Sequence, residues 1–111
     1  MEKVILTPFI CLNDFEGIDK YSKGFHRHGA PKFKIKHIRV GYPVADFGSG
    51  KFKVFTLAEN QTLTAGELLR LINDFVAGEL KKSDNTAHKT EDYCIEKVEI
   101  LRNKAEVQFG S

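Results

Sequence analysis

The chain has 111 residues, of which 41% are hydrophobic and 29% are charged, and its formal net charge at neutral pH is +2. This length and composition predict one folded, soluble domain, covering residues 1–111, and exclude wholesale disorder. The longest apolar runs are too short to cross a bilayer and lack the features of a secretory signal, so we expect a cytoplasmic protein with no membrane segment.

Positive charge is concentrated in the first half of the chain. Residues 1–53 contain ten lysines and arginines against five acidic residues, whereas residues 54–111 contain seven against ten. The basic residues are densest over residues 20–53, where aromatic residues recur between them. A basic segment of this kind is typical of proteins that contact a polyanion.

The N-terminal third is predicted to form one strand and a long loop. Residues 3–12 are rich in β-branched and aromatic residues, and Pro8 indicates either an edge strand or a strand that is broken there. Residues 13–31 lose periodicity and contain three glycines, which predicts a long loop that includes one helical turn near residues 14–21.

Two further strands are predicted to form an antiparallel pair. Residues 32–40 alternate lysine with apolar residues and then change phase, which predicts a strand with a bulge near Lys36 and His37. A loop containing glycine and proline separates this strand from its partner over residues 51–57, in which the alternation resumes.

The helix prediction rests on a start signal and an apolar face. Thr64 and Glu67 have the spacing of a capping box, which places the start of the helix at about Ala65 and its end at Gly78 or Lys82. One face of this helix is apolar, formed by Leu68, Leu71, Ile72, Phe75 and Val76.

The remainder is predicted to be a flexible polar connection over residues 81–92 and a β-hairpin over residues 93–109. A turn at Asn103-Lys104 would pair Ile100 with Val107 on one face of the hairpin. The fold expected from these elements is α+β: a mainly antiparallel sheet of about five strands, in the order β-β-β-α-β-β, with one helix packed on one face.

The basic strand pair and the loop before it supply the candidate nucleic-acid contacts. Alternate residues of a strand face the same side, so successive lysines would lie roughly 6.6 to 6.8 Å apart and could follow a phosphate backbone without reading bases. The candidate residues are His26, Arg27, His28, Lys32, Lys34, Lys36, Arg39, Lys51 and Lys53. The solvated face of an amphipathic strand pair explains the same pattern equally well.

The sequence therefore predicts a small, non-enzymatic binding module, and two alternatives remain. The first is a protein-interaction or inhibitor domain, of a phage or mobile-element type, whose basic face docks on an acidic protein surface. The second is a small RNase that uses His26, His28 or His37 in acid/base cleavage. No motif fixes a catalytic residue or a cofactor, and the basic surroundings of the histidine pair oppose a metal site.

The two cysteines, Cys11 and Cys94, lie 83 positions apart and match no zinc or thiol-redox spacing. We expect two buried thiols in a reducing compartment. If both segments were neighbouring strands of one sheet, a disulfide would be the alternative.

Overall fold

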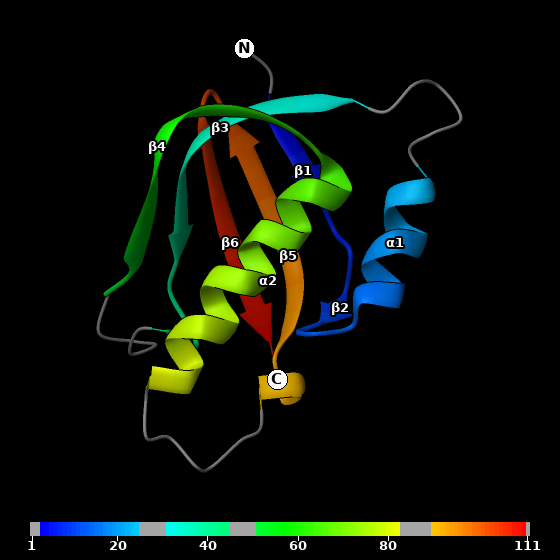
Figure 1. Cartoon of the computed structure of the whole chain (residues 1–111), viewed down its shortest axis with the longest axis vertical. Helices are drawn as coiled ribbons and strands as arrows, with labels where there is room; N and C mark the ends of the chain where they lie inside the picture. The colour runs from blue at the N-terminus through cyan, green and yellow to red at the C-terminus, as the bar shows by residue number, and fades with distance from the viewer. Residues whose placement is uncertain (1–2, 25–30, 45–50, 83–89, 111) are drawn as a thin grey trace.

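The computed structural model describes residues 3–24, 31–44, 51–82 and 90–110. Within these residues the fold is α+β, with six strands in one mixed sheet and helix α2 lying across one of its faces (Figure 1). The strands are β1 (Val4–Leu6), β2 (Ile10–Cys11), β3 (Lys32–Val40), β4 (Lys53–Thr64), β5 (Cys94–Leu101) and β6 (Lys104–Gly110). The helices are α1 (Phe15–Lys23), α2 (Ala65–Lys82) and the short 3-10 helix η2 (Thr90–Asp92).

The sheet has the strand order β1-β5-β6-β3-β4, and β2 also pairs with β5. The pairing of β3 with β6 is parallel, and the other pairings are antiparallel. The predicted α+β class is confirmed, but the predicted element order and the single helix are wrong, because the described elements run β-β-α-β-β-α-β-β. Periodicity identifies strands and not their partners, so it could not indicate that the last strand lies beside β3.

A helix, α1, replaces the first part of the loop that was expected after the first strand. The Asp14 carboxylate caps it by accepting a hydrogen bond of 2.9 Å from the Gly17 amide. Only Ile18 is fully buried within this helix, so its apolar periodicity is too weak to read from the sequence. The break predicted near Pro8 is confirmed, since β1 and β2 lie on either side of it.

The predicted pairing of β3 with β4 is confirmed, and so is the bulge. The register shifts between Ile35 and His37, and the amides of Lys36 and His37 both donate to the Asn103 carbonyl, at 2.7 and 3.1 Å. β4 is longer than expected and arches over the N-terminal end of α2 (Figure 1). Its residues 57–60 lie between two paired stretches and have no partner residue in β3.

Helix α2 begins as predicted. The Thr64 amide donates to Glu67 at 2.9 Å, and the Glu67 amide donates to the Thr64 hydroxyl at 3.2 Å. The hydrogen bond from the Thr64 amide is the main cause that lowers the pKa of Glu67. The helix ends at Lys82, inside the segment expected to be a flexible connection; residues 83–89 of that segment lie outside the described residues. No helix in the described ranges has the length and apolar character needed to cross a membrane.

The terminal hairpin is confirmed, but its predicted register is wrong by two residues. The turn lies at Arg102-Asn103, and Ile100 lies opposite Ala105 instead of Val107. A two-residue shift leaves every side chain on its predicted face, so the apolar pattern cannot distinguish the two registers. Arg102 adopts a φ of 59°, a left-handed conformation that the sequence does not signal, because arginine rarely occupies it.

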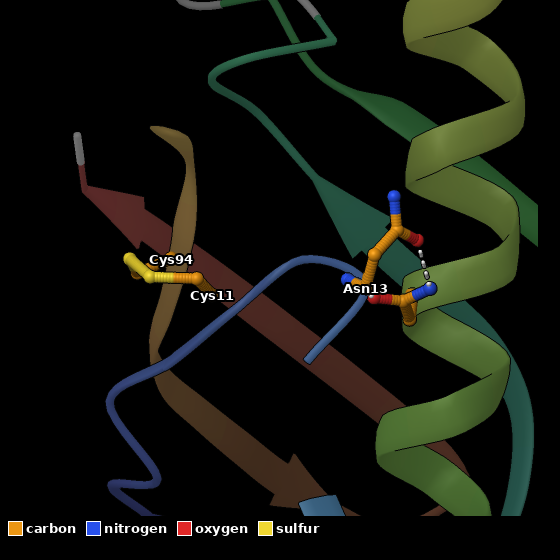
Figure 2. The surroundings of a disulfide bond; sticks show 4 residues. Cys11, Asn13 and Cys94 are labelled. Atoms are coloured by element: carbon orange, nitrogen blue, oxygen red, sulfur yellow. Dashed lines mark hydrogen bonds between the residues drawn. A yellow bond between two sulfur atoms is a disulfide. The ribbon is translucent and has the colours of Figure 1, made fainter. Parts of the chain in front are cut away.

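β2 is joined to β5 by a disulfide between Cys11 and Cys94, which lie directly opposite each other (Figure 2). The expectation of two free thiols is therefore wrong, and the alternative was right, because the two cysteines are cross-strand neighbours. Two residues after Cys11, Asn13 contacts α2 through two hydrogen bonds. The backbone amide of Asn13 donates to the Asn73 side-chain oxygen at 2.6 Å, and the Asn73 side-chain nitrogen donates to the Asn13 side-chain oxygen at 3.1 Å (Figure 2).

Candidate functional site

One face of the sheet is buried under α2, and no described element covers the other. Because side chains alternate along each strand, the register assigns residues to this uncovered side, which we call the open face. Its central residues come from β3, β4, β5 and β6: Lys32, Lys34, His37, Arg39, Val54, Thr56, Lys97, Glu99, Lys104 and Glu106. Lys3 extends it beyond β1, next to Glu99.

Net positive charge lies on the open face and not on the helices. Six lysines and arginines of the open face, including Lys3, stand against three glutamates, Glu96, Glu99 and Glu106, which gives a formal charge of +3. Helices α1 and α2 together contain five basic and five acidic residues, so their formal charge is zero. The excess of positive charge along the chain therefore becomes, in the fold, an excess on one surface.

Two of the open-face glutamates, Glu99 and Glu106, form ion pairs with neighbouring basic side chains. Glu106 lies 3.3 Å from Arg39 and 3.2 Å from Lys104, and Glu99 lies 3.0 Å from Lys97. The hydrogen bond from Lys97 lowers the pKa of Glu99, and the nearby charge of Lys3 acts in the same direction. These groups are partly exposed, so each pair adds little to stability; their effect is to fix where charge sits on the surface.

Lys53 does not belong to the open face. It lies opposite Val40, which is fully buried, so its side chain is on the α2 side of the sheet. There its ammonium group contacts the Glu79 carboxylate at 2.7 Å and lowers the pKa of Glu79. Lys53 therefore does not share a surface with Lys32 and Lys34 of β3; Lys51, just before β4, is exposed.

The other predicted contacts divide into three groups. Lys32 and Lys34 are exposed on β3, and Lys36 is half-buried at the bulge. His37 is half-buried, and its Nδ1 lies 3.2 Å from the Thr56 hydroxyl. Three residues, His26, Arg27 and His28, lie outside the described residues. Within the residues that are described, no three histidine, cysteine or acidic side chains gather in a way that could hold a metal ion.

An aromatic group joins this surface beside Arg39. The guanidinium of Arg39 lies 3.5 Å from the centre of the Phe52 ring, in a cation–π contact. Phe52 and Val54 are 48% and 43% exposed, so the rim of the open face at β4 is apolar. Arg39 is thus held between a carboxylate and a ring.

Two open grooves meet at the β5–β6 turn. One, of about 510 Å³, is lined by Lys3, Glu99, Leu101, Arg102, Asn103, Lys104 and Glu106. The other, of about 490 Å³, is lined by Lys34, Asn60, Arg102 and Asn103. They share the two turn residues, and four basic side chains line one or both grooves: Lys3, Lys34, Arg102 and Lys104.

Three of these four residues were not among the predicted contacts. Arg102 and Lys104 belong to the half of the chain that is acidic overall, and Lys3 is isolated in sequence. The parallel pairing of β3 with β6 brings the turn alongside Lys34, and no local pattern signals that pairing. The only sequence signal for these contacts is the pair of basic residues, Arg102 and Lys104, on either side of Asn103.

Comparison of the chain with models of protein families, with curated proteins and with solved structures finds no match. The function is therefore inferred from the chemistry of the open face. Lysine and arginine side chains around a groove attract anions, and the grooves at the turn end of this surface have room for a ligand.

Proposed function

We propose that the protein is a non-enzymatic binding module whose open face contacts the phosphate backbone of a nucleic acid. The observation that carries this proposal is the placement of charge: a formal +3 on the open face against zero on the two helices. A flat sheet face with spaced cations suits an extended polyanion, because backbone phosphates need positive charge at intervals and no deep pocket.

The proposed contact differs from the one that the sequence predicts. It uses Lys32, Lys34 and Arg39 of β3, adds Lys104 of β6, and leaves out Lys53. The ion pairs of Arg39 and Lys104 with Glu106 weaken their attraction for phosphate, so the lysines without such partners should contribute more.

The test is binding to generic single-stranded and double-stranded DNA and RNA over a salt series. We expect affinity to fall linearly with salt on logarithmic axes. The double variant Lys32→Gln, Lys104→Gln should reduce the slope for a single strand by about 0.7 to 1.4, since each full phosphate contact is worth about 0.7 and Lys104 is partly neutralised by Glu106.

A matched control places the same charge change on the helices. The variant Lys23→Gln, Lys81→Gln removes two exposed lysines from the last turns of α1 and α2. It should keep the wild-type slope. Equal slopes for the two double variants, or no binding at low salt by the wild-type chain, would contradict the proposal.

A second candidate is a protein-interaction module that docks on an acidic protein surface. The observation that favours it is the mixture of groups on the open face, where ion-paired glutamates stand beside the exposed side chains of Ile5, Val54 and Leu101. Exposed apolar side chains suit a protein partner better than a phosphate backbone, which offers little apolar surface. Salt-dependent binding to poly-glutamate with none to any nucleic acid would select this candidate.

A further inference from the structure

The groove of about 490 Å³ between β3, β4 and the β5–β6 turn has a lining that differs from the rest of the open face. It forms where residues 57–60 of β4 leave β3 unpaired. Lys34 borders it from β3, Asn60 from β4, and Arg102 and Asn103 from the turn. Its lining therefore contains two cations, two amides and no carboxylate, whereas the neighbouring groove contains Glu99 and Glu106.

The four polar side chains of this groove have no hydrogen bond or ion pair with any other described residue. Elsewhere on the open face, Arg39, Lys97 and Lys104 are each paired with a glutamate. Unpaired donors that converge on one hollow can all turn to a ligand without breaking a bond within the protein. Lysine, arginine and asparagine each supply N–H donors, so the ligand that fits is an acceptor with negative charge.

Backbone strain gives an independent reason to assign a role to Arg102. Its φ of 59° is unfavourable for a side chain of this size, and glycine or asparagine would occupy the position more easily. The strained turn presents a guanidinium group at the mouth of the groove, and strained residues are concentrated at functional sites. Stability alone does not explain an arginine here.

We propose that this groove binds a terminal phosphate group, and that the chain thereby prefers a nucleic-acid strand with a phosphorylated end. A terminal phosphate carries a charge of about −1.5 to −2 near neutral pH, against −1 for a backbone phosphodiester, and has three free oxygens. The planar fork of Arg102 can bind two of those oxygens, and Lys34 can bind the third as a point charge. The inference rests on the proposed nucleic-acid contact and adds to it the recognition of a phosphorylated strand end.

The experiment compares three forms of one single-stranded oligonucleotide: with a 5′-phosphate, with a 3′-phosphate, and with neither. We expect one phosphorylated form to bind about tenfold tighter than the unphosphorylated form, which corresponds to one charge-assisted hydrogen-bonded contact. Arg102→Gly and Lys34→Gln should each remove most of that preference. Lys81→Gln on α2 should retain it in full.

The glycine variant also separates binding from folding. Glycine accepts a positive φ, so Arg102→Gly should melt at a higher temperature than the wild-type chain while it loses the preference for the phosphorylated end. Loss of preference in a more stable protein cannot be attributed to unfolding. A preference that survives Arg102→Gly would contradict the assignment.

Competitors identify the source of the phosphate. If inorganic phosphate or a nucleoside monophosphate displaces the phosphorylated strand only at millimolar concentration, the groove binds the end of a polynucleotide. If either displaces it at micromolar concentration, the groove binds a small phosphate ester, and the preference for a strand is overturned. Equal binding of the three oligonucleotides by the wild-type chain would overturn the inference and leave the proposed function standing. Absence of binding to all three would overturn both.

Discussion

At the scale of single residues, Asn73 connects α2 to the segment that follows β2. It is 1% exposed, and no other polar or charged residue in the described part of the chain is buried. Both polar atoms of its amide are used, one by the backbone amide of Asn13 and one by the Asn13 side chain. A buried amide that is fully satisfied in this way fixes one arrangement of two elements that are 60 positions apart.

Replacement of Asn73 should be costly for that reason. We expect Asn73→Ala to lower the free energy of unfolding by about 1–3 kcal/mol, because it leaves the Asn13 amide without its acceptor. Asn13→Gly is the matched comparison: it removes only the side-chain half of the pair, at a position where φ is 67° and glycine is well suited. Denaturant unfolding of both variants tests this, and a smaller loss for Asn73→Ala than for Asn13→Gly would contradict it.

The structural roles of some of these residues could be predicted from the sequence, and those of others could not. Thr64 and Glu67 were identified in advance, because a capping box depends only on spacing along the chain. Nothing in the sequence distinguishes Asn73 or Arg102. The importance of Asn73 comes from a contact with a distant loop, and that of Arg102 from a backbone conformation that arginine normally avoids.

At the scale of elements, the disulfide ties the N-terminal strands to the C-terminal hairpin. β2 has only two residues, Ile10 and Cys11, and both pair with β5. So short a strand gains little from its backbone hydrogen bonds, and the covalent bond to Cys94 keeps it in register. The loop that this bond closes includes both helices and the strands β3 and β4.

Loss of the disulfide should therefore destabilise the whole chain. We expect the double variant Cys11→Ala, Cys94→Ala to lose about 2–4 kcal/mol of unfolding free energy, since the cross-link restricts a long segment of the unfolded chain. Thermal melting with and without a reducing agent provides the check. The reductant should lower the melting temperature of the wild-type chain toward that of the variant and leave the variant unchanged; equal melting temperatures throughout would show that the bond does not contribute.

Elements with strong local signals were predicted well. α2 combines a capping box with an apolar face, and β3 shows its bulge as a change of phase. α1 was predicted only as one helical turn within a loop, because it is short and buries a single residue, Ile18. Arg70 and Asp19 form an ion pair of 3.0 Å between the two helices, and the absence of a side chain on Gly66 leaves room for Ser22; neither contact can be read from one segment alone.

At the scale of the molecule, the fold rearranges the charge that the sequence displays. The sequence predicts a basic first half and an acidic second half, but the parallel pairing of β3 with β6 mixes the halves on the open face. Lys104 and Glu106 from the second half join Arg39 from the first, and Lys53 is removed to the α2 side. The sequence thus indicates that one surface carries positive charge. Which residues form that surface depends on the pairing of β3 with β6, which are distant in sequence.

This rearrangement leads to a test that separates the distribution of charge from its total. The double substitution Glu16→Gln, Asp74→Asn removes two exposed negative charges from the helices. Combined with Lys32→Gln, Lys104→Gln it keeps the formal charge at +2 but reduces the open face from +3 to +1. Combined instead with Lys23→Gln, Lys81→Gln, it keeps both the formal charge and the open face unchanged.

If the open face binds the polyanion, these two fourfold variants should differ although their net charges are equal. The first should lose affinity for a single strand at low salt and show the smaller salt slope, since contacts at short range decide both quantities. The second should match the wild-type chain. Equal affinities would mean that total charge governs the interaction, because a protein attracted only by its net charge has no preferred face to present to the strand.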